Sequence, residues 1–79
     1  MEVENKLKSV FTDVFGIPVS KVGVTTKQNT LEGWDSLGQL RLIMAVEEVF
    51  DVSFTVAEIA ILTDYELVLN ALLRKLDGR

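Results

Sequence analysis

The sequence predicts a small all-α protein: a four-helix bundle of three longer helices and one short helix, with a long loop between the first two. Apolar residues recur at helical spacing in three separate segments. Glycine and proline gather in one stretch, residues 16–33, which reads as a loop. Hydrophobic residues make up 48% of the 79 residues, enough for the core of a single domain over residues 1–79.

The first helix is expected over residues 2–15. Apolar side chains line one face of it: Val3, Leu7, Val10, Phe11, Val14 and Phe15. Gly16 is a typical C-terminal stop, and Pro18 prevents the helix from continuing. The loop then covers residues 16–35, a length that in so small a domain usually points either to a function or to a wrongly assigned element.

The second helix is expected over residues 36–51. Asp35 and Ser36 stand at its start, where capping side chains are favoured. Gly38 in the first turn costs roughly 1 kcal/mol relative to alanine. The long apolar run behind it is expected to offset that cost.

A short third helix is expected over residues 56–62, capped by Ser53 or Thr55. The same segment also suits a strand, because Val56, Ile59 and Ile61 favour extended structure.

The fourth helix is expected over residues 64–76. Thr63 and Glu66 have the spacing of a capping box, and Arg74 and Lys75 complement the helix dipole in the last turn. One broad face is apolar: Tyr65, Val68, Leu69, Leu72, Leu73 and Leu76. Tyr65 is expected in the core with its hydroxyl at the rim.

Composition excludes several classes of function. The chain has no cysteine and no histidine, so it lacks a disulfide scaffold, the usual zinc ligands, a thiol nucleophile and a general base that titrates near neutrality. A net charge of −4 argues against nucleic-acid binding. No apolar run is long enough for a membrane span, and the N-terminus lacks signal-peptide features. The expectation is a cytoplasmic, monomeric, non-catalytic protein without a metal, and Met1 with the charged end 75–79 suggests a complete small protein.

The second helix carries one apolar face more than a surface helix needs. At roughly 100° per residue, one arc is the expected core face: Leu42, Ile43, Val46, Val49 and Phe50. A second arc on the opposite side contains Leu37, Leu40 and Met44, flanked by Glu47, Glu48 and Asp51.

Two interpretations of this second face are open. The short third helix covers it, or it is an exposed docking patch with acidic edges. Charge favours docking, because residues 35–66 hold seven acidic residues and a single basic residue, Arg41. Arg41 itself is expected to be solvated rather than paired with Glu48.

The stretch Gly33-Trp34-Asp35-Ser36-Leu37-Gly38 lies where the long loop meets the second helix. A helix N-terminus offers unpaired N–H groups and the positive end of the dipole. Ser36 therefore suits either of two roles, as a helix cap or as the carrier of a phosphate. Asp35 beside it is placed to orient a metal-bound donor or a transferase residue during modification. Trp34 is expected to pack against the first helix or the loop.

Asp35-Ser36-Leu37, followed by the run from Leu40 to Asp51 that contains Glu-Glu-Val-Phe, resembles the acyl carrier protein / peptidyl carrier protein family. The resemblance covers nearly the whole chain, in the order and lengths of the helices. It implies that Ser36, flanked by Asp35 and Leu37, is esterified with 4′-phosphopantetheine from coenzyme A. The arm ends in a thiol that holds acyl or aminoacyl groups as thioesters, which fits a chain without cysteine.

The resemblance also implies the partners. They are a phosphopantetheinyl transferase and acyl-loading and acyl-processing enzymes, and the protein is their substrate and shuttle rather than an enzyme. The second helix would be the docking surface, through Leu37, Leu40, Arg41, Met44, Glu47, Glu48 and Asp51. In some members of the family the bundle interior also shelters the acyl chain.

Two departures bear on the pathway. Carriers of bacterial fatty acid synthesis commonly have acidic residues where this chain has Gly38 and Arg41, and Trp34 is atypical of them. The sequence is more similar to discrete carriers of specialised metabolism, which include polyketide, nonribosomal-peptide and short hydroxyacyl or aminoacyl pathways. A fatty acid synthesis carrier is the alternative, and an unmodified helical adaptor is an alternative of another class. A serine hydrolase is a poor fit, because no histidine exists to activate Ser36.

Overall fold

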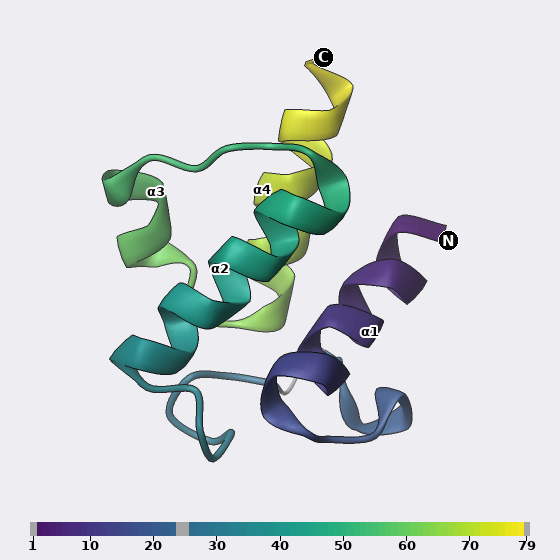
Figure 1. Cartoon of the computed structure of the whole chain (residues 1–79), viewed down its shortest axis with the longest axis vertical. Helices are drawn as coiled ribbons and strands as arrows, with labels where there is room; N and C mark the ends of the chain where they lie inside the picture. The colour runs from purple at the N-terminus through teal and green to yellow at the C-terminus, as the bar shows by residue number, and fades with distance from the viewer. Residues whose placement is uncertain (1, 24–25, 79) are drawn as a thin grey trace.

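The computed structural model describes residues 2–23 and 26–78, and its helices form a small bundle (Figure 1). The elements are α1 (Glu2–Phe15), a short 3-10 turn η1 (Val19–Lys21), α2 (Ser36–Phe50), α3 (Val56–Ile61) and α4 (Tyr65–Asp77). The predicted all-α class, with three longer helices and one short one, is confirmed. The described residues form no strand, and their one isolated bridge joins Lys27 to Asp64.

The helix ends show which capping residues act. The Thr55 hydroxyl accepts from the N–H of Glu58, whose carboxylate accepts from the N–H of Thr55, so α3 starts with a capping box. α2 ends at Phe50, and Asp51 follows in the left-handed region with φ of 55°. This turn ends the helix one residue earlier than the predicted range.

The capping box predicted for the fourth helix is wrong. Asp64 caps α4, and its carboxylate accepts from the N–H of Leu67 at 2.8 Å. Thr63 lies one residue too early because its carbonyl accepts from the N–H of Gln28, which holds its backbone in a bridge to the long loop. Glu66 lies in the first turn of α4 without that role.

The core contains an aromatic cluster. Trp34 is buried, with its ring edge-on to Phe11 at 5.2 Å and stacked on Phe15 at 5.6 Å between centroids. Phe11 also meets Tyr65 at 5.5 Å. The predicted packing of Trp34 against the first helix is therefore confirmed, and it fixes the end of the loop just before Ser36.

Tyr65 lies deeper than predicted. Its side chain is 2% exposed, and its hydroxyl is buried without a hydrogen-bond partner among the described residues. Burial, with a smaller contribution from the negative charge of Glu4, raises the pKa of Tyr65 to about 12. The expectation of a hydroxyl at the rim is wrong, because the oxygen is buried and the ring packs against Phe11 of α1.

Val49 is the exception on the predicted core face of α2. Leu42, Ile43, Val46 and Phe50 are buried as expected, whereas Val49 is 51% exposed. Helical periodicity predicts the direction in which a side chain points, but not which segment lies beside it. At the last turn of α2, Phe50 and Phe54 close the core and leave Val49 outside it.

The long loop is tied to the connection between α3 and α4. The N–H of Gln28 donates to the Thr63 carbonyl, and the N–H of Tyr65 donates to the Thr26 carbonyl, each at 2.9 Å. The loop therefore returns along the base of the bundle to reach the start of α2 (Figure 1). Across the part of the chain described, no helix is long and apolar enough to span a membrane.

Candidate functional site

The start of α2 divides two tasks between neighbouring residues. Asp35 is the helix cap, and its carboxylate oxygen Oδ1 accepts from the N–H of Gly38 at 2.8 Å. Ser36 is the first helical residue, and its side chain is exposed. Its hydroxyl makes no hydrogen bond to any described residue. The capping alternative for Ser36 is therefore wrong, and its oxygen is available for chemistry.

Gly38 allows the loop to lie against the first turn of α2. A Cβ atom at this position would overlap the carbonyl oxygen of Gly33 and lie 3.1 Å from the Phe15 ring. Gly33 itself has φ of 91°, a conformation that favours glycine. Glycine at position 38 thus costs helix propensity, but it lets the backbone of Gly33 approach the first turn of α2 closely. This packing holds the turn that contains Ser36.

The surroundings of Ser36 fit a phosphate ester. The N–H groups of Ser36 and Leu37 lack partners within the helix, since each would need an acceptor four residues earlier. They lie at the positive end of the dipole of a 15-residue helix, which favours a negative group on the neighbouring oxygen. Exposure of the hydroxyl gives a modifying enzyme access to it.

A hollow of about 370 Å³ opens beside this serine between α2 and α3. Its walls combine amide, hydroxyl and aliphatic groups: Gln28, Ser36, Gln39, Leu40, Ile59, Ala60 and Thr63. Ser36 thus stands at the edge of a recess rather than on a flat surface.

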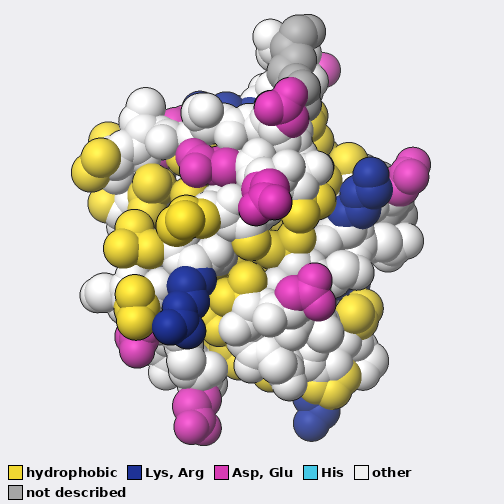
Figure 2. Space-filling model, in the orientation of Figure 1, with side chains coloured by type: hydrophobic (Ala, Val, Ile, Leu, Met, Phe, Trp, Pro, Cys, Tyr) yellow, Lys and Arg dark blue, Asp and Glu magenta, His cyan; other side chains and the backbone are white. Residues whose placement is uncertain are grey.

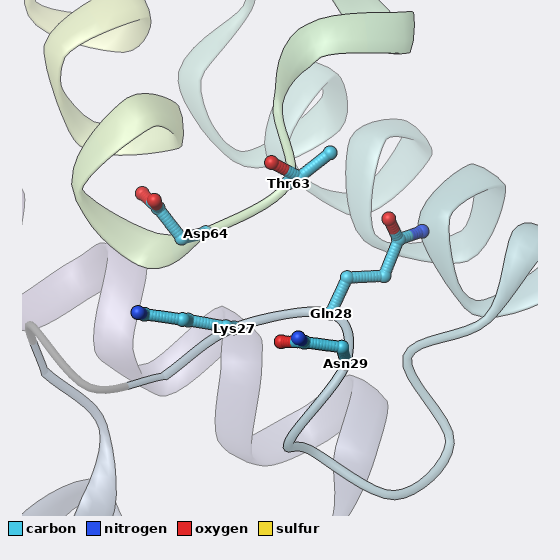
Figure 3. Close-up of a pocket in the computed structure, with 5 residues that line it drawn as sticks. All are labelled: Lys27, Gln28, Asn29, Thr63 and Asp64. Carbon is cyan, nitrogen blue, oxygen red and sulfur yellow. The ribbon is translucent and has the colours of Figure 1, made fainter.

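A larger hollow of about 430 Å³ lies nearby but does not include Ser36. It is lined by Lys27, Gln28, Asn29, Thr63 and Asp64 (Figure 3). Lys27 and Asp64 extend to one side of it and Gln28 to the other, where Gln28 also lines the smaller hollow. It is the polar surface over the bridge between the loop and the α3–α4 connection. We place the candidate site at the smaller hollow, because only that one contains the exposed serine. The described residues hold no group of three or more side chains suited to a metal ion.

A family model described as a phosphopantetheine attachment site matches residues 5–70. The chain belongs to this family. It is a carrier domain, the attachment site of covalently bound 4′-phosphopantetheine, and such domains generally do not catalyse reactions themselves. No curated protein matches the chain.

The second apolar face of α2 in this carrier is exposed. Leu37, Leu40 and Met44 are between 53% and 67% exposed. The alternative that the short helix covers them is wrong. On α3, Val56 is 85% exposed and Ile61 is 64% exposed. Figure 2 shows hydrophobic side chains gathered over α2 and α3, with acidic side chains beside them and a basic one among them. We call Leu37, Leu40 and Met44 the apolar face.

The charged residues predicted for docking differ in their surroundings. Arg41, Glu48 and Asp51 are exposed, and no ion pair joins Arg41 to Glu48 in the described ranges. Glu47 is half-buried, and its carboxylate accepts from the N–H of Phe54 at 2.9 Å. Glu47 therefore also holds the connection between α2 and α3.

Sequence reasoning missed Gln39 as part of the site, and it missed the exposure of Val56 and Ile61. The one sequence signal for Gln39 is that a polar residue stands on a side of α2 that is otherwise buried. Val56 and Ile61 belong to a six-residue helix, too short for a reliable apolar period. Their exposure depends on how α3 turns against α2.

Proposed function

We propose that the domain, residues 1–79, carries its 4′-phosphopantetheine arm on Ser36 and shuttles acyl or aminoacyl groups between enzymes. The observation that carries the proposal is the exposed Ser36 hydroxyl at a helix start that Asp35 already caps. Family membership over residues 5–70 supports it, since those residues include this turn. An unmodified adaptor would give no reason for that arrangement.

The chain's own residues contribute position and charge. Loading forms a bond between the Ser36 oxygen and a phosphorus of coenzyme A, breaks the pyrophosphate bond, and releases the nucleotide part. The serine proton passes to a base of the transferase, because this chain has no histidine to accept it. Asp35 and Leu37 flank the ester, and the helix N-terminus stabilises its negative charge. When bound, the arm supplies the thiol that this cysteine-free chain lacks.

The test is intact mass spectrometry after incubation with coenzyme A, Mg²⁺ and a broad-specificity phosphopantetheinyl transferase. The wild type is expected to gain the mass of one phosphopantetheine, and Ser36→Ala none. Ser53→Ala removes another exposed serine and should load like the wild type. A mass gain by Ser36→Ala, or none by the wild type while a known carrier is loaded in the same tube, would refute the assignment.

The apolar face is our proposed docking surface for the transferase and for acyl-loading and acyl-processing enzymes. It adjoins Ser36 and includes Leu37, the residue that follows it. Glu48 and Asp51 are exposed at the C-terminal end of α2, opposite the end that holds Ser36, so basic partners would be steered to this helix. A small surface of this kind suits brief, sequential contacts better than a large interface.

For the pathway we propose specialised biosynthesis, of polyketide or nonribosomal-peptide type. Arg41 supports this, because it is exposed within the docking surface where fatty acid synthesis carriers commonly have an acidic residue. Arg41→Glu is expected to improve acyl transfer with fatty acid synthase partners at steady state. An unchanged rate would remove this argument and leave fatty acid synthesis as the alternative.

A further inference from the structure

The side chain of Gln39 joins three parts of the molecule. Its amide nitrogen donates to the carbonyls of Ile59 at 2.8 Å and Leu62 at 3.0 Å, at the end of α3. Its amide oxygen accepts from Nε1 of Trp34 at 2.6 Å. Both amide hydrogens and the oxygen are therefore engaged, and the side chain is buried.

These bonds lie between the hollow beside Ser36 and the core. Gln39 lines the hollow, while Trp34 on its other side packs into the aromatic cluster. An alkyl chain that entered the core between α2 and α3 would separate Gln39 from its partners. The Trp34 N–H and two carbonyls would then lack partners in a place that water reaches poorly, which is unfavourable.

The hollow itself is half polar. Its polar lining comes from Gln28, Ser36, Gln39 and Thr63, and its aliphatic lining from Leu40, Ile59 and Ala60. Such walls offer hydrogen bonds to amide, hydroxyl or amino groups and only a shallow aliphatic surface.

We infer that this carrier keeps its cargo outside the bundle, that Gln39 closes the core to alkyl chains, and that the cargo class is a short, polar acyl or aminoacyl group. The inference rests on the proposed attachment at Ser36 and narrows the class of group carried there. A long alkyl chain left in water would be an unfavourable cargo for such a carrier.

The test compares the 79-residue chain loaded with acetyl- or octanoyl-phosphopantetheine from the corresponding coenzyme A thioesters. Intact mass first establishes that each form is loaded. Two readouts follow: the thermal midpoint, and the NMR signals of the Trp34 indole N–H and the Gln39 side-chain amide. Trp34 is the single tryptophan of the chain, so its signal is unambiguous.

The two loaded wild-type forms are expected to have thermal midpoints within about 2 °C of each other and unmoved Trp34 and Gln39 signals. Burial of an octanoyl chain in the core would raise the midpoint by more than about 5 °C. That rise, together with shifted Trp34 and Gln39 signals, would overturn the inference. Absence of loading would instead refute attachment and remove the basis of the inference, and the mass spectrum separates these two failures.

A pair of glutamine variants tests the role of Gln39. Gln39→Met keeps the length of the side chain but removes its hydrogen bonds, so octanoyl loading is expected to raise the midpoint of this variant more than acetyl loading does. Gln28→Met is the matched control, because Gln28 lines the same hollow and its side chain makes no hydrogen bond to a described residue. Equal responses of the two variants would show that Gln39 does not close the core.

Discussion

Asp35 and Ser36 show how adjacent residues at one helix start take different roles. The carboxylate of Asp35 reaches the N–H of Gly38, which satisfies a donor that a serine cap would otherwise serve. Ser36 then points outward with a free oxygen. A site for covalent modification needs such a residue, one that the local backbone does not require for its own hydrogen bonds.

Gln39 is the contrasting case to Ser36, because its side chain is fully used in hydrogen bonds within the protein. It is a polar residue in a mostly apolar segment, and every polar atom of its side chain is engaged. Its bonds reach residues 20 and 23 positions away along the chain. Local pattern alone therefore cannot reveal this role.

Tyr65 is the residue at which stability is expected to depend on alkaline pH. Its folded pKa of about 12 lies above the ordinary value of 10.0, so the unfolded chain loses this proton first as pH rises. The free energy of unfolding should therefore fall between about pH 10 and 12, and the contribution of Tyr65 is fully present below that range. Denaturant unfolding at several pH values measures this.

Tyr65→Phe is the matched variant, because it removes only the buried, unpartnered hydroxyl. We expect it to be more stable than the wild type by about 1 kcal/mol at neutral pH and to lose less stability above pH 10. Since Tyr65 is the single tyrosine, its ionisation can also be followed directly by ultraviolet absorbance. Equal pH slopes in the two proteins would contradict the assignment.

At the scale of elements, α3 is too short to be stable alone and depends on its attachments. Gln39 holds its C-terminal end, and the Thr55–Glu58 capping box holds its start. Glu58 also pairs with Lys75 of α4 at 2.8 Å, and Lys75 lies 5.3 Å from the centre of the Phe54 ring. These contacts decide where one wall of the hollow beside Ser36 lies.

The pairing of Glu58 gives a prediction for α3. Its hydrogen bond to Lys75, and then that from the N–H of Thr55, lower the pKa of Glu58 below its ordinary value of 4.5. The contribution of Glu58 to the free energy of unfolding is thus fully present above the ordinary pKa of 4.5, and it is lost as pH falls through the lower folded pKa.

Glu58→Gln keeps an oxygen for the cap but removes the charge. Amide hydrogen exchange in α3 is expected to become faster, with little change in α1. Glu48→Gln, an exposed change on α2, serves as the control. Unchanged exchange in α3 with Glu58→Gln would show that the ion pair does not hold this helix.

At the scale of the whole molecule, charge and apolar surface fall on the same side. Residues 1–34 carry four lysines and four acidic residues, whereas residues 35–66 carry seven acidic residues and one arginine. The fold brings the exposed part of the second group beside the apolar face. Association with a basic partner should accordingly weaken as salt rises.

Docking itself can be tested by substitution on the apolar face. Leu40→Glu is expected to lower kcat/KM for loading by about tenfold, which corresponds to about 1.4 kcal/mol, without lowering the thermal midpoint. Leu67→Glu is the control, because Leu67 is an exposed leucine on α4, outside the proposed face. Equal losses in both variants would indicate a general effect of added charge rather than a docking contact.

The sequence by itself determined the helical class, the order of the elements, most of the core and the turn that holds Ser36. These depend on local chemistry: apolar spacing, glycine and proline in the loop, and an aspartate before a helix. Tertiary structure alone decided the depth of Tyr65, the exposure of Val49 and the apolar face, the cap of α4, and the bonds of Gln39. Each of these depends on which distant segment lies against a given side chain, and helical period supplies the direction of a side chain but not its neighbour.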